Sequence, residues 1–369
     1  MARTGYTEPV VDYALDALFG ELDARTLHDT IADELGSLAA LDGFVAREGR
    51  PEVFFAPQGD VAIVSSDTTI GVAVPALVYA LCAKASVLVK DRDDALVRAF
   101  AETIATERPE LGARMSVETW DGSNVDASRD RLADARVVLA YGRNETLRAI
   151  RRVLRPEARF VPFGHRTSIG YVAREALAAP AAARDMARAL ATDAFLFDGE
   201  GCLSIHVAFV ERGGALEPAE FAQIAGNACD EVAVEFPAGF SELDPAGIAI
   251  RSAALFRAAQ GTGAVYGGVL APHLLVLDPD PADPPPWARR TLGLYSVDGP
   301  EEALAFLQRH GLELEAVATA PGTRAEIDAF AIAAGASRLA AFGTLQRPPL
   351  GGEHGGVGRI LPFVRAIYK

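Results

Sequence analysis

Apolar positions along the chain follow two alternating patterns. Short runs rich in branched side chains have the length and composition of buried strands, and longer stretches between them place apolar residues at helical spacing. The strand-like runs lie at residues 61–66, 86–91, 136–142 and 159–164, and the helical stretches at 13–47, 71–83, 94–105 and 144–154. This alternation predicts βαβ units, in which a parallel sheet carries helices on both faces.

A second series of the same kind follows after residue 178. Its expected helices lie at 178–192, 218–229 and 299–310, and its expected strands at 205–211, 273–278 and 291–297. A chain of 369 residues is too long for one ordinary core, so we expect an α/β protein with two doubly wound, Rossmann-like domains. We place the first domain, with its N-terminal helices, at residues 1–168, the second at 169–345, and a glycine-rich C-terminal segment at 346–369.

Charge and cysteine content narrow the class of protein. The formal net charge of −15 argues against a nucleic acid or an anionic membrane as partner, because both would be repelled. Cys82, Cys202 and Cys229 are too few and too scattered for a disulfide framework or a zinc site. The N-terminus lacks an apolar leader region, and no run of about 18 apolar residues occurs. We therefore expect a cytoplasmic protein that acts on small molecules.

Cys202 follows the glycine-rich acidic turn D-G-E-G and precedes an apolar run. A free cysteine usually behaves as a small buried apolar residue. The turn before it can leave backbone N–H groups free, as a thiolate or an adjacent oxyanion requires. Asp198 and Glu200 act in the opposite direction if they lie close, because their charge raises the pKa of a thiol. The local sequence leaves open whether Cys202 is a core residue or a nucleophile.

Two other segments place polar groups at the carboxyl ends of expected strands, where open α/β sheets bind ligands. Lys90 and Arg92 end one strand, and they are suited to a ribose or a phosphate. Gly142 and Arg143 stand between a strand and a helix, where a phosphate can bind the helix N-terminus. The alternatives are a solvated strand end and a glycine that only the backbone requires. A third segment, Pro348 to Arg359, is dense in glycine, which indicates a close backbone approach to another element or to a ligand.

Taken in order, these segments resemble the aldehyde dehydrogenase superfamily and, within it, the LuxC-like fatty-acyl-CoA reductase branch. A-S-V-L-V-K is similar to the family strand that contacts the cofactor ribose, with Ser86 and Lys90 at its ends. L-A-Y-G-R resembles the phosphate turn, and F-V-P-F-G-H-R-T-S-I the loop that joins the domains. D-G-E-G-C-L-S resembles the nucleophile segment and gives Cys202. The segment from Pro348 to Arg359 resembles the glycine-rich C-terminal signature, which implies that residues 346–369 return to the domain interface. The resemblance covers nearly the whole chain from about Val61 and implies two domains of the aldehyde dehydrogenase type.

The resemblance implies an acyl-CoA reductase. An acyl-CoA or acyl-carrier thioester would acylate Cys202, and a nicotinamide cofactor would then deliver hydride and release an aldehyde. NADPH is the cofactor that the branch suggests, with NADH as the alternative. The cofactor residues that it implies are Ser66, Ser86, Lys90, Arg92, Asp93, Gly142, Arg143 and Gly164. It also suggests a homo-oligomer or a partner enzyme that accepts the aldehyde.

The chain departs from the oxidising members of the superfamily at two places. Their interdomain loop carries a glutamate that activates water, whereas the loop around Gly164 has no acidic residue, which favours reduction over oxidation. Their oxyanion-hole asparagine corresponds to Asp67 or Thr68. A threonine hydroxyl can donate a hydrogen bond to an oxyanion, whereas an ionised Asp67 would repel it.

Several alternatives stay open at this point. Asp93 could hold ribose hydroxyls and favour NAD, while Arg92 could pair with a 2′-phosphate and favour NADP. Cys202 could instead serve an acyltransferase or hydrolase that uses His206 as base, since the two would share a strand face. The chain could also be a catalytically impaired member of the family that binds cofactor or a partner.

Overall fold

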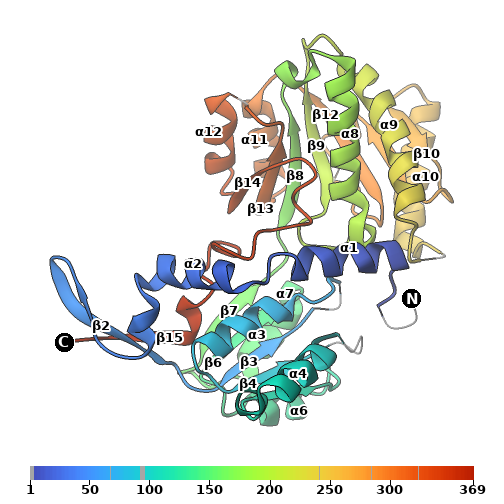
Figure 1. Ribbon diagram of the computed structural model, residues 1–369. Coiled ribbons are helices and arrows are strands. Elements are labelled where there is room, and N and C mark those ends of the chain that lie inside the picture. The colour runs from blue at the N-terminus through green and yellow to red at the C-terminus, as the bar shows by residue number, and fades with distance from the viewer. Residues whose placement is uncertain (1–3, 67, 92–95, 241, 284, 323) are drawn as a thin grey trace. The chain divides into compact units, whose positions relative to one another are not determined.

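The computed structural model describes residues 4–66, 68–91, 96–240, 242–283, 285–322 and 324–369. The chain forms two compact units (Figure 1). The Cys202 unit comprises the N-terminal stretch up to Tyr13 together with Arg166–Pro348, and the Lys90 unit comprises Ala14–His165 and Pro349–Lys369. Each unit therefore draws on two separate parts of the sequence.

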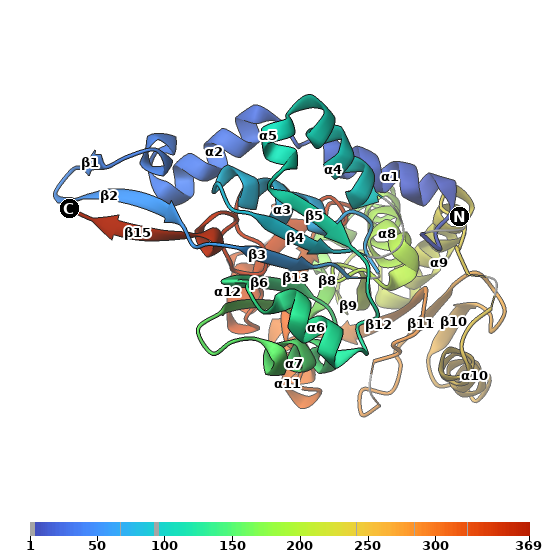
Figure 2. The ribbon, with the colours of Figure 1, turned by 90° about the horizontal axis from the view of Figure 1, so that it is seen from below.

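A parallel sheet with the strand order β5-β4-β3-β6-β7 forms the centre of the Lys90 unit. Its strands are β3 (Val61–Val64), β4 (Val87–Lys90), β5 (Met115–Glu118), β6 (Val137–Tyr141) and β7 (Arg159–Phe163). The helices around it are α3 (Ala73–Cys82), α4 (Leu96–Glu107), α5 (Pro109–Gly112), α6 (Val125–Leu132) and α7 (Asn144–Val153). Alternate side chains of the strands enter two different cores, one with α3 and α4 and one with α6. Figure 2 shows the sheet between these two layers.

Two helices and a second, smaller sheet complete the Lys90 unit. The helices are α1 (Glu8–Phe19), which contributes residues to both units, and α2 (Ala24–Leu35), followed by a 3₁₀ turn at Leu38–Leu41. The antiparallel sheet has the order β1-β2-β15, formed by β1 (Val45–Arg47), β2 (Arg50–Pro57) and β15 (Val364–Tyr368). The end of the chain thus returns to the unit in which most of the first half of the sequence folds.

The Cys202 unit contains the sheet β10-β11-β12-β9-β8-β13-β14, in which β10 runs antiparallel to β11 and the other neighbours are parallel. Its strands are β8 (Thr167–Val172), β9 (Ile205–Glu211), β10 (Ala264–Gly267), β11 (Leu274–Leu277), β12 (Thr291–Val297), β13 (Leu314–Thr319) and β14 (Arg338–Ala341). Its helices are α8 (Pro180–Phe195), α9 (Pro218–Glu235), α10 (Pro245–Ala259), α11 (Pro300–Arg309) and α12 (Ala325–Ala333). The α8 and α9 helices lie on one face of the sheet (Figure 1), and α11 and α12 pack on the other.

The division between the units differs from the expected boundaries at both ends of the first domain. Thr167 and Ser168 begin β8 and belong to the Cys202 unit. The N-terminal stretch also belongs there, because Tyr6 packs against Phe197 with ring centroids 5.6 Å apart. Thr7 adds a hydrogen bond from Oγ1 to the Pro237 carbonyl at 2.9 Å. These contacts join residues that are far apart in the sequence, so local patterns gave no sign of them.

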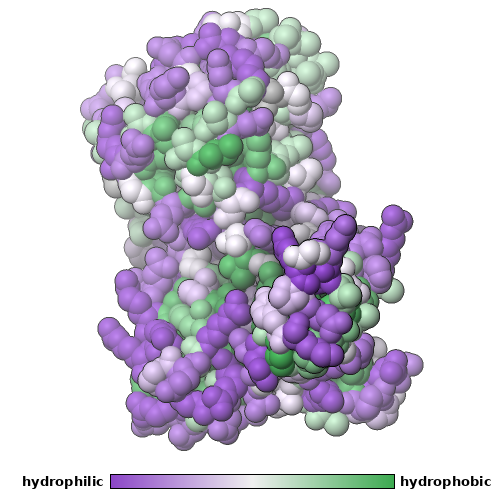
Figure 3. All heavy atoms as spheres, turned by 90° about the vertical axis from the view of Figure 1, so that its left-hand side faces the viewer, coloured by the Kyte–Doolittle hydropathy of each residue, from purple (hydrophilic) through white to green (hydrophobic). Residues whose placement is uncertain are grey.

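On the face that Figure 3 shows, hydrophilic and hydrophobic residues are intermingled. None of the described helices combines the length and apolar character needed to cross a bilayer.

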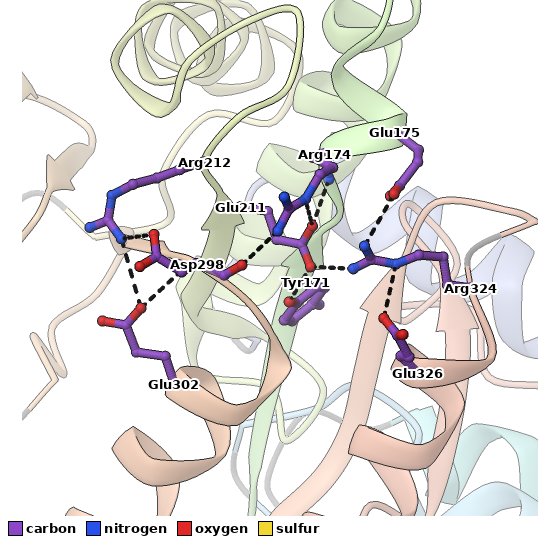
Figure 4. A network of polar contacts seen from close by, with 9 residues as sticks. All are labelled: Tyr171, Arg174, Glu175, Glu211, Arg212, Asp298, Glu302, Arg324 and Glu326. Carbon is purple, nitrogen blue, oxygen red and sulfur yellow. Dashed lines mark hydrogen bonds and ion pairs between the residues drawn. The ribbon is translucent and has the colours of Figure 1, made fainter.

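A buried ion cluster lies at the carboxyl ends of β8 and β9 (Figure 4). Glu211 is fully buried and accepts hydrogen bonds from the Tyr171 hydroxyl at 2.6 Å, Arg174 Nε at 2.8 Å and Arg324 Nη2 at 2.5 Å. Burial opposes ionisation of Glu211, but these donors outweigh it and lower the pKa of the carboxyl group. The cluster fastens β9 to segments that follow β8 and β13 at the edge of the sheet opposite to Cys202.

Candidate active site

Cys202 lies in a turn between α8 and β9 whose backbone is unusual. Phe197, Asp198 and Gly199 are consecutive left-handed residues, with φ angles of 53°, 55° and 76°. Two non-glycine residues in this region are strained and need support from the surrounding structure. Asp198 receives that support from Arg290, whose Nε lies 2.8 Å from Oδ1, and from the Gly239 N–H, 3.0 Å from Oδ2. The D-G-E-G segment therefore forms a turn that these bonds to Asp198 stabilise, as its glycines and acids indicated.

Further hydrogen bonds fix the backbone on either side of the cysteine. Ser168, fully buried on β8, donates from Oγ to the Cys202 carbonyl at 3.2 Å. The Ser204 N–H donates to the Gly201 carbonyl at 3.0 Å. Cys202 itself is exposed, whereas Cys229 is buried in α9. This arrangement places Cys202 on a fixed backbone with part of the residue exposed, which a nucleophile requires and a core cysteine does not.

The acidic residues of the turn are neutralised by neighbouring arginines. Arg290, which is fully buried, pairs with Asp198, and Arg289 Nη2 lies 3.0 Å from Glu200 Oε2. The expectation that these two acids would raise the pKa of the thiol therefore needs correction. The pKa of Cys202 is raised to about 11 by desolvation from the protein around the sulfur and then by Glu315. The acid that affects the thiol thus comes from β13 and not from the turn.

Glu315 is the second residue of β13, and its side chain is only 16% exposed. Arg166 Nη1 lies 3.6 Å from its Oε2 and also donates to Ser337 Oγ at 2.9 Å. Burial nevertheless raises the pKa of Glu315, because desolvation outweighs the attraction of Arg166. Since β13 pairs with β8, the acid lies at the same amino edge of the sheet as Ser168.

His206 does not stand in the position of a base for Cys202. Its Nε2 lies 2.7 Å from the Gly199 carbonyl oxygen and its Nδ1 lies 3.2 Å from the Thr291 carbonyl oxygen. The imidazole also packs edge-on against Trp287, with ring centroids 5.0 Å apart. Cys202 precedes the start of β9 at Ile205, so the two residues do not share a strand face as expected. His206 instead ties the turn to the β12 side of the sheet.

The carboxyl edge of the Lys90 unit sheet brings several of the expected cofactor residues together. Ser66 and Thr68 follow β3, and the Thr68 N–H donates to Ser66 Oγ at 3.4 Å. Lys90 ends the neighbouring strand, and its Nζ lies 5.4 Å from the centroid of the Trp120 ring. Gly142 follows β6 on the other side of β3. The order of the strands reverses between β3 and β6, and open α/β sheets bind ligands at such a point.

The turn at Gly142 suits a phosphate. Arg143 is the N-cap residue of α7, and no side chain caps the first turn of that helix. A Cβ at Gly142 would have no neighbour closer than 3.8 Å, where it would meet Thr146. Packing does not require this glycine, but the backbone does, because its φ of 154° is one that other residues rarely adopt. The missing side chain also leaves room over the helix N-terminus. The exposed Arg143 adds a positive charge beside that space.

Of two further expected cofactor residues, Ser86 lies elsewhere, whereas Gly164 directly follows β7 at the same carboxyl edge. Ser86 precedes β4, at the strand end opposite to Lys90, so the structure does not bring it to the carboxyl edge. Gly164 is needed for packing, because a Cβ there would lie 2.5 Å from Asn144 Oδ1. That oxygen accepts a hydrogen bond from the His165 N–H at 3.3 Å. Three more expectations, Asp67, Arg92 and Asp93, fall outside the described residues.

The glycine-rich C-terminal segment places a histidine beside the Gly142 turn. The His354 ring packs edge-on against Phe163 and Tyr141, at centroid distances of 4.6 and 5.9 Å. Tyr141 and Phe163 stack on each other at the ends of β6 and β7. The dense glycines thus mark a close approach to another element, one of the two expected outcomes. Among the described residues, no group of three or more possible ligands could hold a metal ion.

Comparison with known sequences decides the family. A family described as acyl-CoA reductase (LuxC) matches residues 1–366. The chain belongs to this family. It is therefore an enzyme of the LuxC group that reduces acyl-CoA to aldehyde, and the resemblance drawn from the segments is confirmed. No curated protein matches the chain by sequence.

Solved structures show the same fold at low sequence identity. An NAD-dependent benzaldehyde dehydrogenase from Corynebacterium glutamicum is 15% identical with a TM-score of 0.64, covering 99% of this chain and 87% of its own. A variant of aldehyde dehydrogenase C from Pseudomonas syringae, complexed with NAD⁺ and octanal, is 13% identical with a TM-score of 0.64. The match covers 98% of this chain and 84% of that protein's chain. An aldehyde dehydrogenase from Brucella melitensis biovar abortus 2308 is 12% identical with a TM-score of 0.63. The match covers 98% of this chain and 88% of that protein's chain. The LuxC-family chain thus has the aldehyde dehydrogenase fold.

Proposed function

We propose that this LuxC-family reductase forms an acyl-enzyme on Cys202. The observation that carries the proposal is an exposed cysteine residue on a turn whose backbone is fixed by Ser168 and Arg290. The Cys202 sulfur loses its proton and attacks the carbonyl carbon of the acyl-CoA thioester. The bond from that carbon to the sulfur of coenzyme A then breaks, and coenzyme A leaves as a thiol after taking up a proton. An acyl-carrier thioester would react in the same way.

The tetrahedral oxyanion of this reaction needs hydrogen-bond donors. The backbone N–H of Cys202 is one candidate donor, and the Thr68 hydroxyl is the second, because Thr68 is one of the two residues that correspond to the family's oxyanion asparagine. Asp67 stays the alternative at that position. The absence of an acidic residue from the loop around Gly164 leaves no glutamate there to activate water, so the acyl-enzyme should await reduction instead of hydrolysis.

A nicotinamide cofactor supplies the hydride that reduces the acyl group on Cys202 to the aldehyde. Ser66, Lys90, Gly142 and Arg143 fit its ribose and phosphate groups, since they lie at one edge of the sheet and the Gly142 turn is open. We propose NADPH as the preferred form, with NADH possible. Arg92 is the proposed partner of a 2′-phosphate, and Asp93 would favour NADH if it holds the ribose instead.

We also propose that the reductase forms a homo-oligomer, with an aldehyde-accepting partner enzyme as the alternative association. Among the described strands, β14 pairs only with β13, so it forms an edge of the sheet. The separate sheet β1-β2-β15 carries the exposed aromatic side chain of Tyr368, and Phe44 is exposed just before β1. The edge strand β14, or an edge strand of the β1-β2-β15 sheet, can pair with a strand of another copy of the chain.

Intact-protein mass spectrometry tests the acyl-enzyme directly. Incubation with an acyl-CoA in the absence of reduced cofactor should add the mass of one acyl group, and NADPH or NADH should then discharge it as aldehyde. Cys202→Ala should abolish both steps and leave cofactor affinity nearly unchanged. Cys82→Ala is the matched control and should still be acylated, because Cys82 is partly buried in α3. An adduct that survives in Cys202→Ala, or no adduct at any chain length, would refute the proposal.

A further inference from the structure

A carboxylate lies deep inside the Cys202 unit, on α8. Asp193 is fully buried, and its Oδ2 accepts from the Gly343 N–H at 2.6 Å while Oδ1 accepts from the Leu345 N–H at 3.2 Å. Burial outweighs these bonds and raises the pKa of Asp193 to about 7. Burying an acid is costly, and an apolar side chain would fill such a space more favourably. The presence of an acid here therefore indicates a role in addition to packing.

The loop that Asp193 holds, Gly343–Gln346, reaches the turn of Cys202. Gln346 Nε2 donates to the backbone carbonyl of Asp193 at 2.8 Å and lies 3.4 Å from Ser204 Oγ. The Ser204 N–H in turn donates to the Gly201 carbonyl and closes the turn. Space is tight there, because a Cβ at Gly201 would lie 3.2 Å from Ser204 Oγ and 3.6 Å from Gln346 Oε1. A continuous chain of contacts thus joins the Asp193 carboxylate to the residues on both sides of the thiol.

We propose that Asp193 is a positioning residue for Cys202, acting through Gln346 and Ser204 on the turn that carries the thiol. This role rests on the proposed function, since it affects catalysis only if Cys202 is acylated. Protonation converts one carboxylate oxygen into a hydroxyl, and the Gly343 or Leu345 N–H then loses its acceptor. The loop loosens, Gln346 no longer supports Ser204, and the turn opens more often.

Several other charged or titratable groups lie near Asp193. Arg338 at the start of β14 favours the ionised form of Asp193. Tyr13 on α1 also senses the charge of Asp193, and Arg347 lies 4.2 Å from the centroid of its ring. The pKa of Tyr13 is raised above its ordinary value, chiefly by burial, so it stays neutral. On α8 itself, Arg188 lies within ion-pair distance of Glu231 and Glu235 of α9.

Hydrogen exchange of the turn tests the proposal without any substrate. Asp193→Asn keeps the shape of the side chain, but its amide cannot accept from both N–H groups, so it mimics the protonated acid at every pH. The exchange rate of the Ser204 amide, taken as the ratio of variant to wild type, should be near one at pH 5.5. It should rise with a midpoint near pH 7 to about tenfold at pH 8.5, the effect of one lost hydrogen bond to a charged group. Any effect of His206 or Glu315 on the exchange rate cancels in this ratio, because the variant and the wild type both contain these residues.

Matched variants define the outcome. Asp185→Asn makes the same change on the exposed face of α8 and should leave the ratio at one. Gln346→Leu removes the link to Ser204 and should speed exchange at all pH values, which keeps the test decisive if Asp193→Asn does not fold. A ratio for Asp193→Asn that does not depend on pH, or normal exchange in Gln346→Leu, would overturn the proposal.

Single-turnover acylation separates this inference from the proposed function. The acylation rate of Cys202 by an acyl-CoA should fall in Asp193→Asn by the same pH-dependent factor. If exchange behaves as expected but the wild type forms no acyl adduct, the acyl-enzyme is wrong and the structural coupling stands. If the wild type is acylated and the rate ratio stays flat with pH, the positioning role is wrong and the acyl-enzyme stands.

Discussion

The acids near Cys202 are of two kinds, which differ in how they pair with arginine. Asp198 and Glu200 belong to the same turn and each pairs with an arginine. Glu315 approaches from β13 and shares its arginine, Arg166, with Ser337. Burial is the larger cause of the raised pKa of the thiol, and of these acids only Glu315 adds to it. Burial and a single acid on another strand together therefore limit how much thiolate the enzyme holds at neutral pH.

Replacing Glu315 with glutamine should make Cys202 more reactive. Removing the negative charge lowers the pKa of the thiol, and each unit of pKa gives about a tenfold larger thiolate fraction below that pKa. We expect the alkylation rate of Cys202 by iodoacetamide at pH 8 to rise about three- to tenfold. Glu313→Gln changes an exposed acid two residues earlier and should have no effect. An unchanged pH dependence in Glu315→Gln would mean that this charge does not reach the sulfur.

Arg289 and Arg290, which pair with the two acids of the turn, should differ sharply in their contribution to stability. Arg290 is fully buried, so Arg290→Gln leaves Asp198 without its charge partner in the interior and should cost about 3–5 kcal/mol. Arg289 pairs with Glu200 near the surface, where such pairs contribute about 0–1 kcal/mol. Urea unfolding of the two variants measures the difference. Equal losses would show that the Asp198 pair does not hold the turn.

At the scale of elements, expectation and structure agree best where a strand or helix has a clear pattern of its own. The expected strands at 61–66, 86–91 and 205–211 are confirmed as β3, β4 and β9, and the helix at 178–192 as α8. The strand β8 was missed, because T-S-I-G-Y-V mixes polar residues and glycine that strands disfavour, although it is buried at every position. Its neighbours β9 and β13 stabilise it, and they lie far away in the sequence.

The same limit applies to the candidate site. Cys202, Lys90 and Gly142 stand at recognisable turns and strand ends, so the sequence indicates them. Glu315 and Asp193 act through elements that come close only in the folded chain, as the bonds from Asp193 to residues 343–345 illustrate. A single acid inside the apolar stretch A-L-A-T-D-A-F-L-F was the available signal for Asp193.

Gly170 in the middle of β8 provides a test of packing at this scale. A Cβ there would lie 3.0 Å from Ala208 Cβ and 3.0 Å from a ring carbon of Phe342. We expect Gly170→Ala to destabilise the protein by about 1–3 kcal/mol through overpacking. Gly268→Ala meets only Ala271, at 3.9 Å, and should be nearly neutral. A thermal or urea unfolding experiment on both variants distinguishes them, and a neutral Gly170→Ala would show that β8 has spare room.

At the scale of the whole molecule, the free edge of β14 should control association. Leu339 on β14 is 40% exposed, and a lysine there places a charge on the edge that would pair with another copy. Leu339→Lys should shift the protein toward monomer in light scattering coupled to size exclusion. Ile332→Lys, on the exposed side of α12, should leave the assembly unchanged. A wild type that is already monomeric contradicts the proposed homo-oligomer.

The return of β15 to β2 has a consequence for synthesis on the ribosome. The Cys202 unit is complete in sequence once Pro348 has left the ribosomal tunnel, whereas the Lys90 unit still lacks the partner strand of β2. The Lys90 unit, most of which is translated first, is therefore the last to finish folding. During that interval the nascent chain exposes the edge of β2, with its apolar Phe54 and Phe55, and this edge is where we expect chaperones to bind the growing polypeptide.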